Sequence, residues 1–238
     1  MQLNGSLVKV NELSTSDKNR MFELLNNYFI NVYFKYFEED LREKQWVIIL
    51  RDEINSEIQG FSTQMILKVS MNGSEYKALF SGDTIIERKY WHQTELIRIW
   101  GKLALRLIEE YPKDELFWFL ISMGYRTYKF LPLFFKEFYP CYNKPMPVSV
   151  KNILDAFAYT KYPQEYNAQK GVIRLQGHQM RLKEGISDIR ENLLKNLHIN
   201  YFIKLNPFYY QGDELACIAR LSKDNFKPCA FKIINSRG

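Results

Sequence analysis

Several signatures of common protein classes are missing from this sequence of 238 residues. Its three cysteines, Cys141, Cys217 and Cys229, are odd in number and form no CxxC pair, so the sequence implies neither a disulfide framework nor a zinc site. The G-x-S-x-G elbow of many hydrolases and the glycine motifs of nucleotide-binding folds are absent too. We therefore expect a reduced, cytoplasmic environment and no metal.

Long apolar runs and blocks of basic residues are also missing. No apolar run approaches the roughly 20 residues of a membrane helix, and the first ten residues, MQLNGSLVKV, lack the apolar centre of a signal peptide. The formal charge is +6, but lysine and arginine alternate with acidic residues along the whole chain. We expect no membrane span, no nucleic-acid partner and a mild preference for an anionic ligand.

Apolar and aromatic residues are plentiful. They make up 46% and 16% of the chain, enough for a well-packed core. Near the amino terminus, residues 6–10 predict a short strand, and residues 14–17 offer caps for a helix. The apolar face of that helix comprises Met21, Leu24, Leu25 and Tyr28. A second helical pattern over 32–42 is either a separate helix or the same helix bent near Ile30-Asn31.

The centre of the chain reads as three antiparallel strands. The segments 45–51, 58–71 and 76–88 are rich in β-branched residues, and turns are expected at Asn55-Ser56 and at Asn72-Gly73. Asn-Gly favours a type I′ turn because both residues tolerate a positive φ.

A long helix and a buried strand follow. Apolar residues recur every three or four positions over 96–108, and Pro112 ends that helix. The run over 116–123 is apolar throughout, as expected of a strand covered on both faces. A helix interrupted or kinked at Pro132 is predicted over 125–138. Residues 76–128 thus form a strand–helix–strand–helix unit, where we expect the chemistry.

The last third of the chain carries weaker patterns. Three prolines over 140–147 mark a loop, after which we predict a helix over 149–159, a strand over 172–175 and a helix over 186–197. Residues 208–221 hold a last strand pair at most. We divide the chain into a core, 1–145, and a segment, 146–238, that packs on the core or completes the same domain.

Three stretches carry a family resemblance: IQGFSTQMIL, FSGDTIIERKYWHQTELIRIWGKLALRLI and FWFLISMGYRTYKFLPLFFKEFYP. In these, and in the order of its elements, the chain resembles the GNAT superfamily of acyl-CoA N-acyltransferases over about residues 6–140. The resemblance implies an α/β fold with a central mixed, mostly antiparallel sheet flanked by helices. The segment after it would be a carboxy-terminal elaboration.

The resemblance also implies an acyl-CoA donor whose pyrophosphate lies at the start of the helix after the fourth strand. The residues at that position are Trp91, His92, Gln93 and Thr94. The glycines of the family's turn are missing here, and Glu95 would repel a phosphate if it pointed inward. Three alternatives stay open: altered pyrophosphate binding, a donor carried by an acyl carrier protein, or loss of the cofactor.

Acyl transfer to an amine needs a base for the amine and an acid for the leaving thiolate. By resemblance, the base is a carboxylate of the fourth strand, Asp83 or Glu87, and the acid is Tyr125 or Tyr128. A surface ion pair for the carboxylates and a core position for the tyrosines are the simpler interpretations. The sequence thus predicts a GNAT-like acyltransferase acting on a small amine, with a non-catalytic binding or regulatory module as the alternative. The many aromatic residues suggest the further hypothesis that the acyl group is long.

Overall fold

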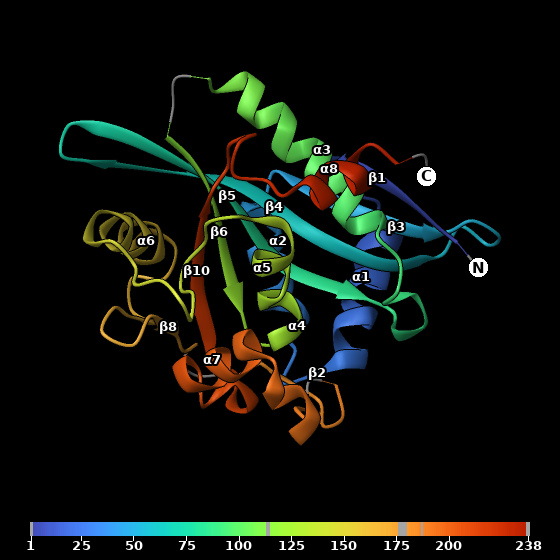
Figure 1. Cartoon of the computed structure of the whole chain (residues 1–238). Coiled ribbons are helices and arrows are strands. Elements are labelled where there is room, and N and C mark those ends of the chain that lie inside the picture. Colours follow the sequence, from blue (N-terminus) through green and yellow to red (C-terminus); the bar gives the residue numbers. More distant parts are fainter. Residues whose placement is uncertain (1, 113–114, 176–179, 187, 237–238) are drawn as a thin grey trace.

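The computed structural model describes residues 2–112, 115–175, 180–186 and 188–236. A single eight-stranded sheet with helices on both faces dominates the structure (Figure 1). The strands follow the order β1-β3-β4-β5-β6-β10-β8-β7, and every pairing is antiparallel except that of β5 with β6. This order confirms the predicted α/β fold with a central mixed, mostly antiparallel sheet flanked by helices.

The strands predicted from the sequence appear near their expected bounds, and the short strand β7 was not predicted. The strands of the large sheet are β1 Leu3–Lys9, β3 Trp46–Asp52, β4 Ile58–Met71, β5 Ser74–Ile86, β6 Glu115–Ser122, β7 Tyr166–Asn167, β8 Val172–Ile173 and β10 Glu214–Arg220. The predicted three-stranded meander is β3-β4-β5. Its second turn has the expected positive φ angles, 52° at Asn72 and 77° at Gly73.

Two helices near the amino terminus cover one face of the sheet. Helix α1, Thr15–Tyr28, begins at Ser14, whose hydroxyl accepts a hydrogen bond from the Asp17 amide. All four predicted face residues of α1 are buried. Helix α2, Phe34–Glu43, is a separate helix, because strand β2, Phe29–Ile30, and Asn31 with a φ of 60° intervene. This settles the alternative between two helices and one bent helix.

On the other face, α3, Glu95–Glu110, lies across the sheet with α8, Pro228–Ile234, packed against it (Figure 1). The approach is close at Gly101, where a Cβ would lie 2.3 Å from Ile234. The predicted helix over 125–138 is shorter than expected. It consists of α4, Tyr125–Tyr128, and α5, Phe130–Phe134, and Pro132 lies inside α5 instead of interrupting the helix.

Strands β5 and β6 are paired only over part of their length. Their register ends at Ser81 opposite Leu120, whereas β5 continues to Ile86. Beyond this point the two strands point apart in Figure 1. The cause lies on the other edge of β5, where Gly82 and Asp83 together face the single residue Thr63 of β4. Such a bulge bends a strand, so β5 turns away from β6 at Asp83.

A polar network fixes the strands beside this bulge. The Ser62 hydroxyl lies 2.7 Å from the Thr84 hydroxyl. The side-chain amide of Gln64 donates a hydrogen bond to the Ser62 oxygen. The side-chain oxygen of Gln64 accepts a hydrogen bond from the Ser81 hydroxyl. The Ser81 oxygen in turn accepts a hydrogen bond from the Trp118 indole N–H. These bonds connect β4, β5 and β6 just before β5 and β6 separate. Buried side chains therefore fix the point at which the two strands separate.

The carboxy-terminal segment adds to the same sheet. Strand β10 pairs with β6 on one side and with β8 on the other, and α6, Val148–Lys161, covers the face that also carries α1 and α2. A second, two-stranded sheet joins β2 to β9, Arg181–Leu182. The last third therefore contacts the core through both sheets.

One prediction for this segment was wrong. Residue 187 of the expected helix over 186–197 lies outside the described residues; the described part holds a 3₁₀ helix, Glu191–Lys195, and the regular helix α7 runs from Leu197 to Leu205. Asn196 sets that start because its side-chain oxygen accepts from two amides of the first turn. Residues 208–221 hold one strand, β10, within the predicted limit of a strand pair, and its partners come from elsewhere in the chain. Across the described ranges, no helix has the length and apolar character needed to cross a membrane.

Candidate functional site

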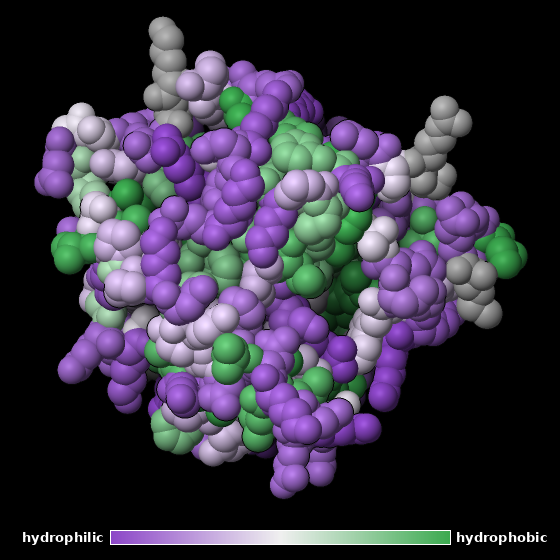
Figure 2. Space-filling view, in the orientation of Figure 1, coloured by the Kyte–Doolittle hydropathy of each residue, from purple (hydrophilic) through white to green (hydrophobic). Residues whose placement is uncertain are grey.

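A cavity of about 1140 Å³ opens where β5 and β6 separate. Its walls come from the ends of those strands, from α1, α2 and α4, and from the segment around β9. The face shown in Figure 2 is mostly hydrophilic, with a recess whose deeper side chains are apolar, beside the end of β5. The charged side chains that line the cavity are Asp40, Asp83, Arg88, Arg126, Lys129, Asp188, Arg190 and Glu214.

Carboxylates gather on one side of this cavity. Asp83 lies on the bulge of β5, Glu214 at the start of β10 and Asp40 on α2. Burial, with the nearby charge of Asp40, raises the pKa of Asp83 to about 7, although Lys44 and Lys161 act in the opposite direction. Burial, with the charges of Asp83 and Asp40, raises the pKa of Glu214 to about 8. Both groups can therefore accept a proton near neutral pH.

Asp40 differs from the other two because it is paired. Burial alone would raise its pKa, but ion pairs with Lys44, at 2.6 Å, and Lys161, at 3.2 Å, outweigh that effect and lower it. Lys161 also bonds to Glu43. The two ammonium groups are thus neutralised by α2 itself, which leaves Asp83 and Glu214 without an ion pair among the described residues.

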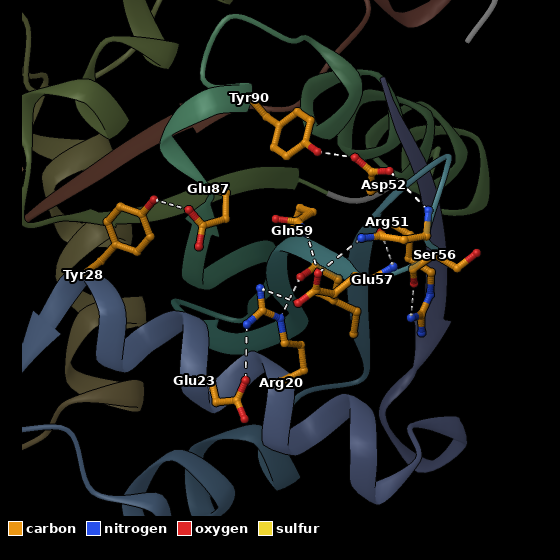
Figure 3. Close-up of polar contacts among 12 residues, drawn as sticks. Arg20, Glu23, Tyr28, Arg51, Asp52, Ser56, Glu57, Gln59, Glu87 and Tyr90 are labelled. Atoms are coloured by element: carbon orange, nitrogen blue, oxygen red, sulfur yellow. Dashed lines mark hydrogen bonds and ion pairs between the residues drawn. The ribbon is translucent and has the colours of Figure 1, made fainter. Parts of the chain in front are cut away.

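Glu87, the other predicted base, lies outside the cavity lining. Its carboxylate accepts a hydrogen bond of 2.9 Å from the Tyr28 hydroxyl, as Figure 3 shows, and that hydroxyl in turn accepts from the Arg88 amide. Burial and the Glu87 carboxylate raise the pKa of Tyr28 to about 12. In this arrangement Glu87 joins α1 to the end of β5.

The two predicted tyrosines also differ in position. Tyr125 begins α4 at the end of β6 and lines the cavity. Tyr128 does not line it: the side chain is fully buried, and its hydroxyl donates a 2.9 Å hydrogen bond to the Pro140 carbonyl. Burial raises the pKa of Tyr128.

Cations gather on another side of the cavity, around Trp91. The guanidinium of Arg126 lies 4.5 Å from the centre of the Trp91 ring, and that of Arg88 lies 5.6 Å from it. The indole is itself fixed, since its N–H donates to the Ile86 carbonyl at 2.7 Å. Neither arginine has a carboxylate partner among the described residues. Lys129 and Arg190 line the cavity as well.

The start of α3 meets the cavity beside this group, since Gln93, Leu96 and Ile97 line it. The Gln93 side-chain oxygen also accepts a 2.9 Å hydrogen bond from the amide of Leu3. Glu95 points elsewhere: its carboxylate accepts from the Gly5 amide of β1 and pairs with Arg98 at 2.6 Å. Hence the acidic residue that could have repelled a phosphate is neutralised outside the cavity.

The four predicted cofactor residues therefore separate into two pairs. Trp91 and Gln93 line the cavity, whereas His92 and Thr94 are exposed and do not. The positive end of the α3 dipole and the cations around Trp91 fit an anionic, phosphate-bearing group, although no glycine allows a close backbone approach.

Sequence reasoning missed several residues of the cavity, among them Asp40, Tyr162 and Glu214. Asp40 lies in an acidic helical face that is typical of solvent exposure. Tyr162 follows α6, and Glu214 opens a strand whose pairing was not predicted. Each comes from a different part of the chain, so no local pattern connects them.

Comparisons with known proteins concern the fold. No family model matches the chain, and no curated protein matches its sequence. Among solved structures, a GNAT family N-acetyltransferase of Escherichia coli in complex with CoA is 14% identical, with 55% of this chain and 69% of that chain covered and a TM-score of 0.39. A probable N-acyltransferase of Enterococcus faecalis is 12% identical, with 92% and 66% covered and a TM-score of 0.45.

A third similar structure is glucosamine-6-phosphate N-acetyltransferase of Arabidopsis thaliana, at 18% identity. It covers 49% of this chain and 81% of its own, with a TM-score of 0.34. What the structure of this chain itself shows is an α/β fold with a mixed, mostly antiparallel sheet flanked by helices. Its function has to be argued from the cavity.

Proposed function

We propose that the protein is an N-acyltransferase that moves an acyl group from a phosphate-bearing thioester, such as acyl-CoA, to an amine. The observation that carries the proposal is the distribution of charge in the cavity. Arg88 and Arg126 offer cations to the donor's phosphates, and Asp83 offers a carboxylate to the acceptor amine. Five residues of extended chain, roughly 16 Å, separate Asp83 from Arg88, so both substrates have room.

In the proposed reaction Asp83 takes a proton from the acceptor's ammonium group. The free amine attacks the thioester carbonyl, a C–N bond forms, the C–S bond breaks, and Tyr125 gives a proton to the leaving thiolate. The nitrogen then loses its second proton, which returns to Tyr125, so that amide and thiol are formed and one proton stays on Asp83. A carboxylate whose pKa is about 7 is well matched to this role, because a general base works best when its pKa lies near the working pH. Beyond Ser81 the backbone of β5 has lost its β6 partner, which leaves polar groups for the donor.

The cavity wall also supports a long acyl group. Apart from its charged residues, the cavity is lined mainly by aliphatic and aromatic side chains, among them Leu25, Val32, Phe37, Ile85, Met123, Phe130, Leu182 and Ile186. A pocket for a single small ligand commonly measures about 300–1,000 Å³. Acyl chain length is therefore a second variable of the test.

The test is a calorimetric titration with CoA and with thioesters of increasing chain length, followed by mass spectrometry of acceptor mixtures. We expect binding at micromolar to millimolar concentration and a mass gain equal to the acyl group. Absence of binding at millimolar concentration would argue against a CoA-dependent enzyme. Binding without any transfer would favour the non-catalytic alternative. A strong preference for acetyl-CoA over long-chain thioesters would exclude the long-chain hypothesis.

A further inference from the structure

Arg88 and Arg126 come from the two strands that separate at the cavity. Arg88 begins a short 3₁₀ helix, Arg88–Tyr90, just after β5, and Arg126 lies in α4, just after β6. Their guanidinium groups nevertheless lie at one ring, because the centre of the Trp91 ring is 5.6 Å from the first and 4.5 Å from the second. Trp91 therefore joins a cation from each side of the opening, beyond the residues that pair β5 with β6.

Other arginines of the chain are ordered by carboxylates. Arg98 donates two hydrogen bonds to Glu95, and Arg174 donates two to Asp213. A carboxylate occupies N–H groups of the guanidinium and neutralises its charge. An aromatic ring contacts the flat face instead, so the N–H donors in the guanidinium plane stay free for an anion. In the described part of the chain the two arginines at Trp91 have no carboxylate partner, and both are exposed, so their charges are available to a ligand.

The Trp91 ring has a fixed position of its own. Its N–H donates a 2.7 Å hydrogen bond to the carbonyl of Ile86, the last residue of β5. The ring also lies 6.4 Å, centre to centre, from that of Tyr28, a buried residue of α1. A ring held in one orientation fixes the guanidinium groups that contact it, and side chains ordered in advance lose less conformational freedom when an anion binds. Trp91 thus prepares both arginines for a ligand.

The backbone of this turn is less suited to binding an anion. Trp91 has a φ of −61° and a ψ of −15°, a right-handed helical conformation that does not need glycine. Its amide donates to the Arg88 carbonyl, and the amide of Gln93 donates to the Tyr90 carbonyl at 2.9 Å. Since these two amides already have acceptors, side-chain cations are the stronger means of holding a phosphate at this turn.

We propose that Trp91 is a positioning residue for the acyl donor, whose ring holds Arg88 and Arg126 so that both guanidinium groups bind the donor's diphosphate. The inference rests on the proposed function and deepens it by naming the donor. Two cations that no carboxylate neutralises match the two charges of a diphosphate, whereas the phosphodiester that links a pantetheine to a carrier protein has one charge. The preferred donor is therefore a free CoA thioester. Trp91 itself takes no part in the reaction.

The first experiment measures the binding of free CoA by calorimetry and needs no acyl transfer. Trp91→Leu removes the ring and should raise the Kd of CoA about tenfold, because two cation–π contacts are lost and the ligand has to order each arginine. Trp91→Phe keeps a ring and should stay within about threefold of the wild-type Kd. A Kd in Trp91→Leu within about twofold of the wild-type value would overturn the inference.

The matched control for this experiment is Phe208→Leu. It removes another exposed ring that lies 5.4 Å from an arginine, Arg174, outside the cavity lining. Asp213 still holds Arg174 in this variant. The Kd of CoA should therefore keep its wild-type value, and a loss equal to that of Trp91→Leu would overturn the inference.

Two further ligands identify the group that the arginines bind. Dephospho-CoA keeps the diphosphate and lacks the 3′-phosphate, so Trp91→Leu should weaken its binding by the same factor. A loss confined to CoA would place the arginines at the 3′-phosphate and overturn their assignment to the diphosphate. An acyl thioester of N-acetylcysteamine has no phosphate. Trp91→Leu should raise the KM of acyl-CoA, leave kcat unchanged and leave the KM of this truncated donor unchanged, and an equal effect on both donors would overturn the inference.

A double-mutant cycle separates positioning from folding. When Arg88→Ala and Arg126→Ala are combined, no guanidinium remains for the ring to hold. Adding Trp91→Leu to that variant should then change the Kd of CoA by less than about twofold. A ring that only supports the fold would cause the same loss with and without the arginines, and that outcome would overturn the inference.

The outcomes also separate this inference from the proposed function. CoA binding that depends on Trp91, with no acyl transfer from any thioester, would contradict the proposed function alone. Acyl transfer from acyl-CoA, with a KM that Trp91→Leu leaves unchanged, would contradict this inference alone. No binding of CoA to the wild-type protein at millimolar concentration would contradict both.

Discussion

The two charged sides of the cavity are built differently. The cations rest on an exposed surface: Arg88 and Arg126 are held by the Trp91 ring and contact no carboxylate among the described residues. The carboxylates sit inside, where burial and mutual repulsion raise the pKa of Asp83 and of Glu214. Exposed cations attract an anion without needing a shifted pKa, whereas the half-buried carboxylates hold protons that they can exchange. The first arrangement suits binding and the second suits chemistry.

The largest effect is expected at the acidic side. Asp83→Asn should lower the rate of acyl transfer by about 10²- to 10⁴-fold, the usual contribution of a positioned general base. Calorimetry should show donor affinity within about twofold of the wild-type value. Asp224→Asn, which changes an exposed aspartate far along the chain, serves as the control for both measurements. Equal losses in donor affinity and in rate would mean that the two sides do not act separately.

The cationic side should respond in the opposite way. Arg88→Ala and Arg126→Ala should each raise the donor's KM about tenfold, because each removes a charge-assisted contact to phosphate. The KM of the acceptor should stay the same. Arg106→Ala removes another exposed arginine, from α3, and should change neither KM. If neither Arg88→Ala nor Arg126→Ala changes the donor's KM, these two arginines do not bind the donor's phosphates.

The two tyrosines sharpen the comparison further. Tyr125→Phe should lower kcat about tenfold and leave the unfolding temperature nearly unchanged, because Tyr125, although only 4% exposed, lines the cavity, and the substitution keeps its aromatic ring. Tyr128→Phe should lower the free energy of unfolding by about 1–3 kcal/mol, since the buried Pro140 carbonyl loses its donor, and should preserve kcat. Kinetics and thermal denaturation of both variants check these outcomes, and a reversed pattern would assign the proton donor to Tyr128.

The smallest effect concerns pH. The acceptor's kcat/KM should rise as pH passes through about 7, where Asp83 loses its proton. Because this pKa is higher in the folded protein than the ordinary value of about 3.9, the native state binds more protons between those two pH values, and stability falls as pH rises through that window. Asp83→Asn should therefore unfold a few degrees above the wild-type protein at pH 8, with little difference at pH 4. An equal difference at both pH values would contradict the raised pKa.

Much of the fold could be predicted from local patterns. The Asn72-Gly73 turn, the face of α1 and the apolar periodicity of α3 all appear where the sequence places them, because turn chemistry and helical spacing act over a few neighbouring residues. The weaker predictions lie in the last third. There α7 begins after its cap Asn196, eleven residues after the predicted start, and β10 pairs with strands distant in sequence.

The candidate site also has a part that local sequence patterns predict and a part that depends on distant contacts. The sequence by itself determined the order of elements and placed Asp83, Trp91, Gln93 and Tyr125 at strand and helix ends that meet one cavity. Only the tertiary structure placed Glu214 near Asp83 and Asp40. It also paired Glu95 with Arg98 and buried Tyr128 against Pro140. The physical reason is that helix and turn propensities depend on adjacent residues. Which charges share a buried space depends on how distant strands pair, and the bulge at Gly82 and Asp83 decides where that space opens.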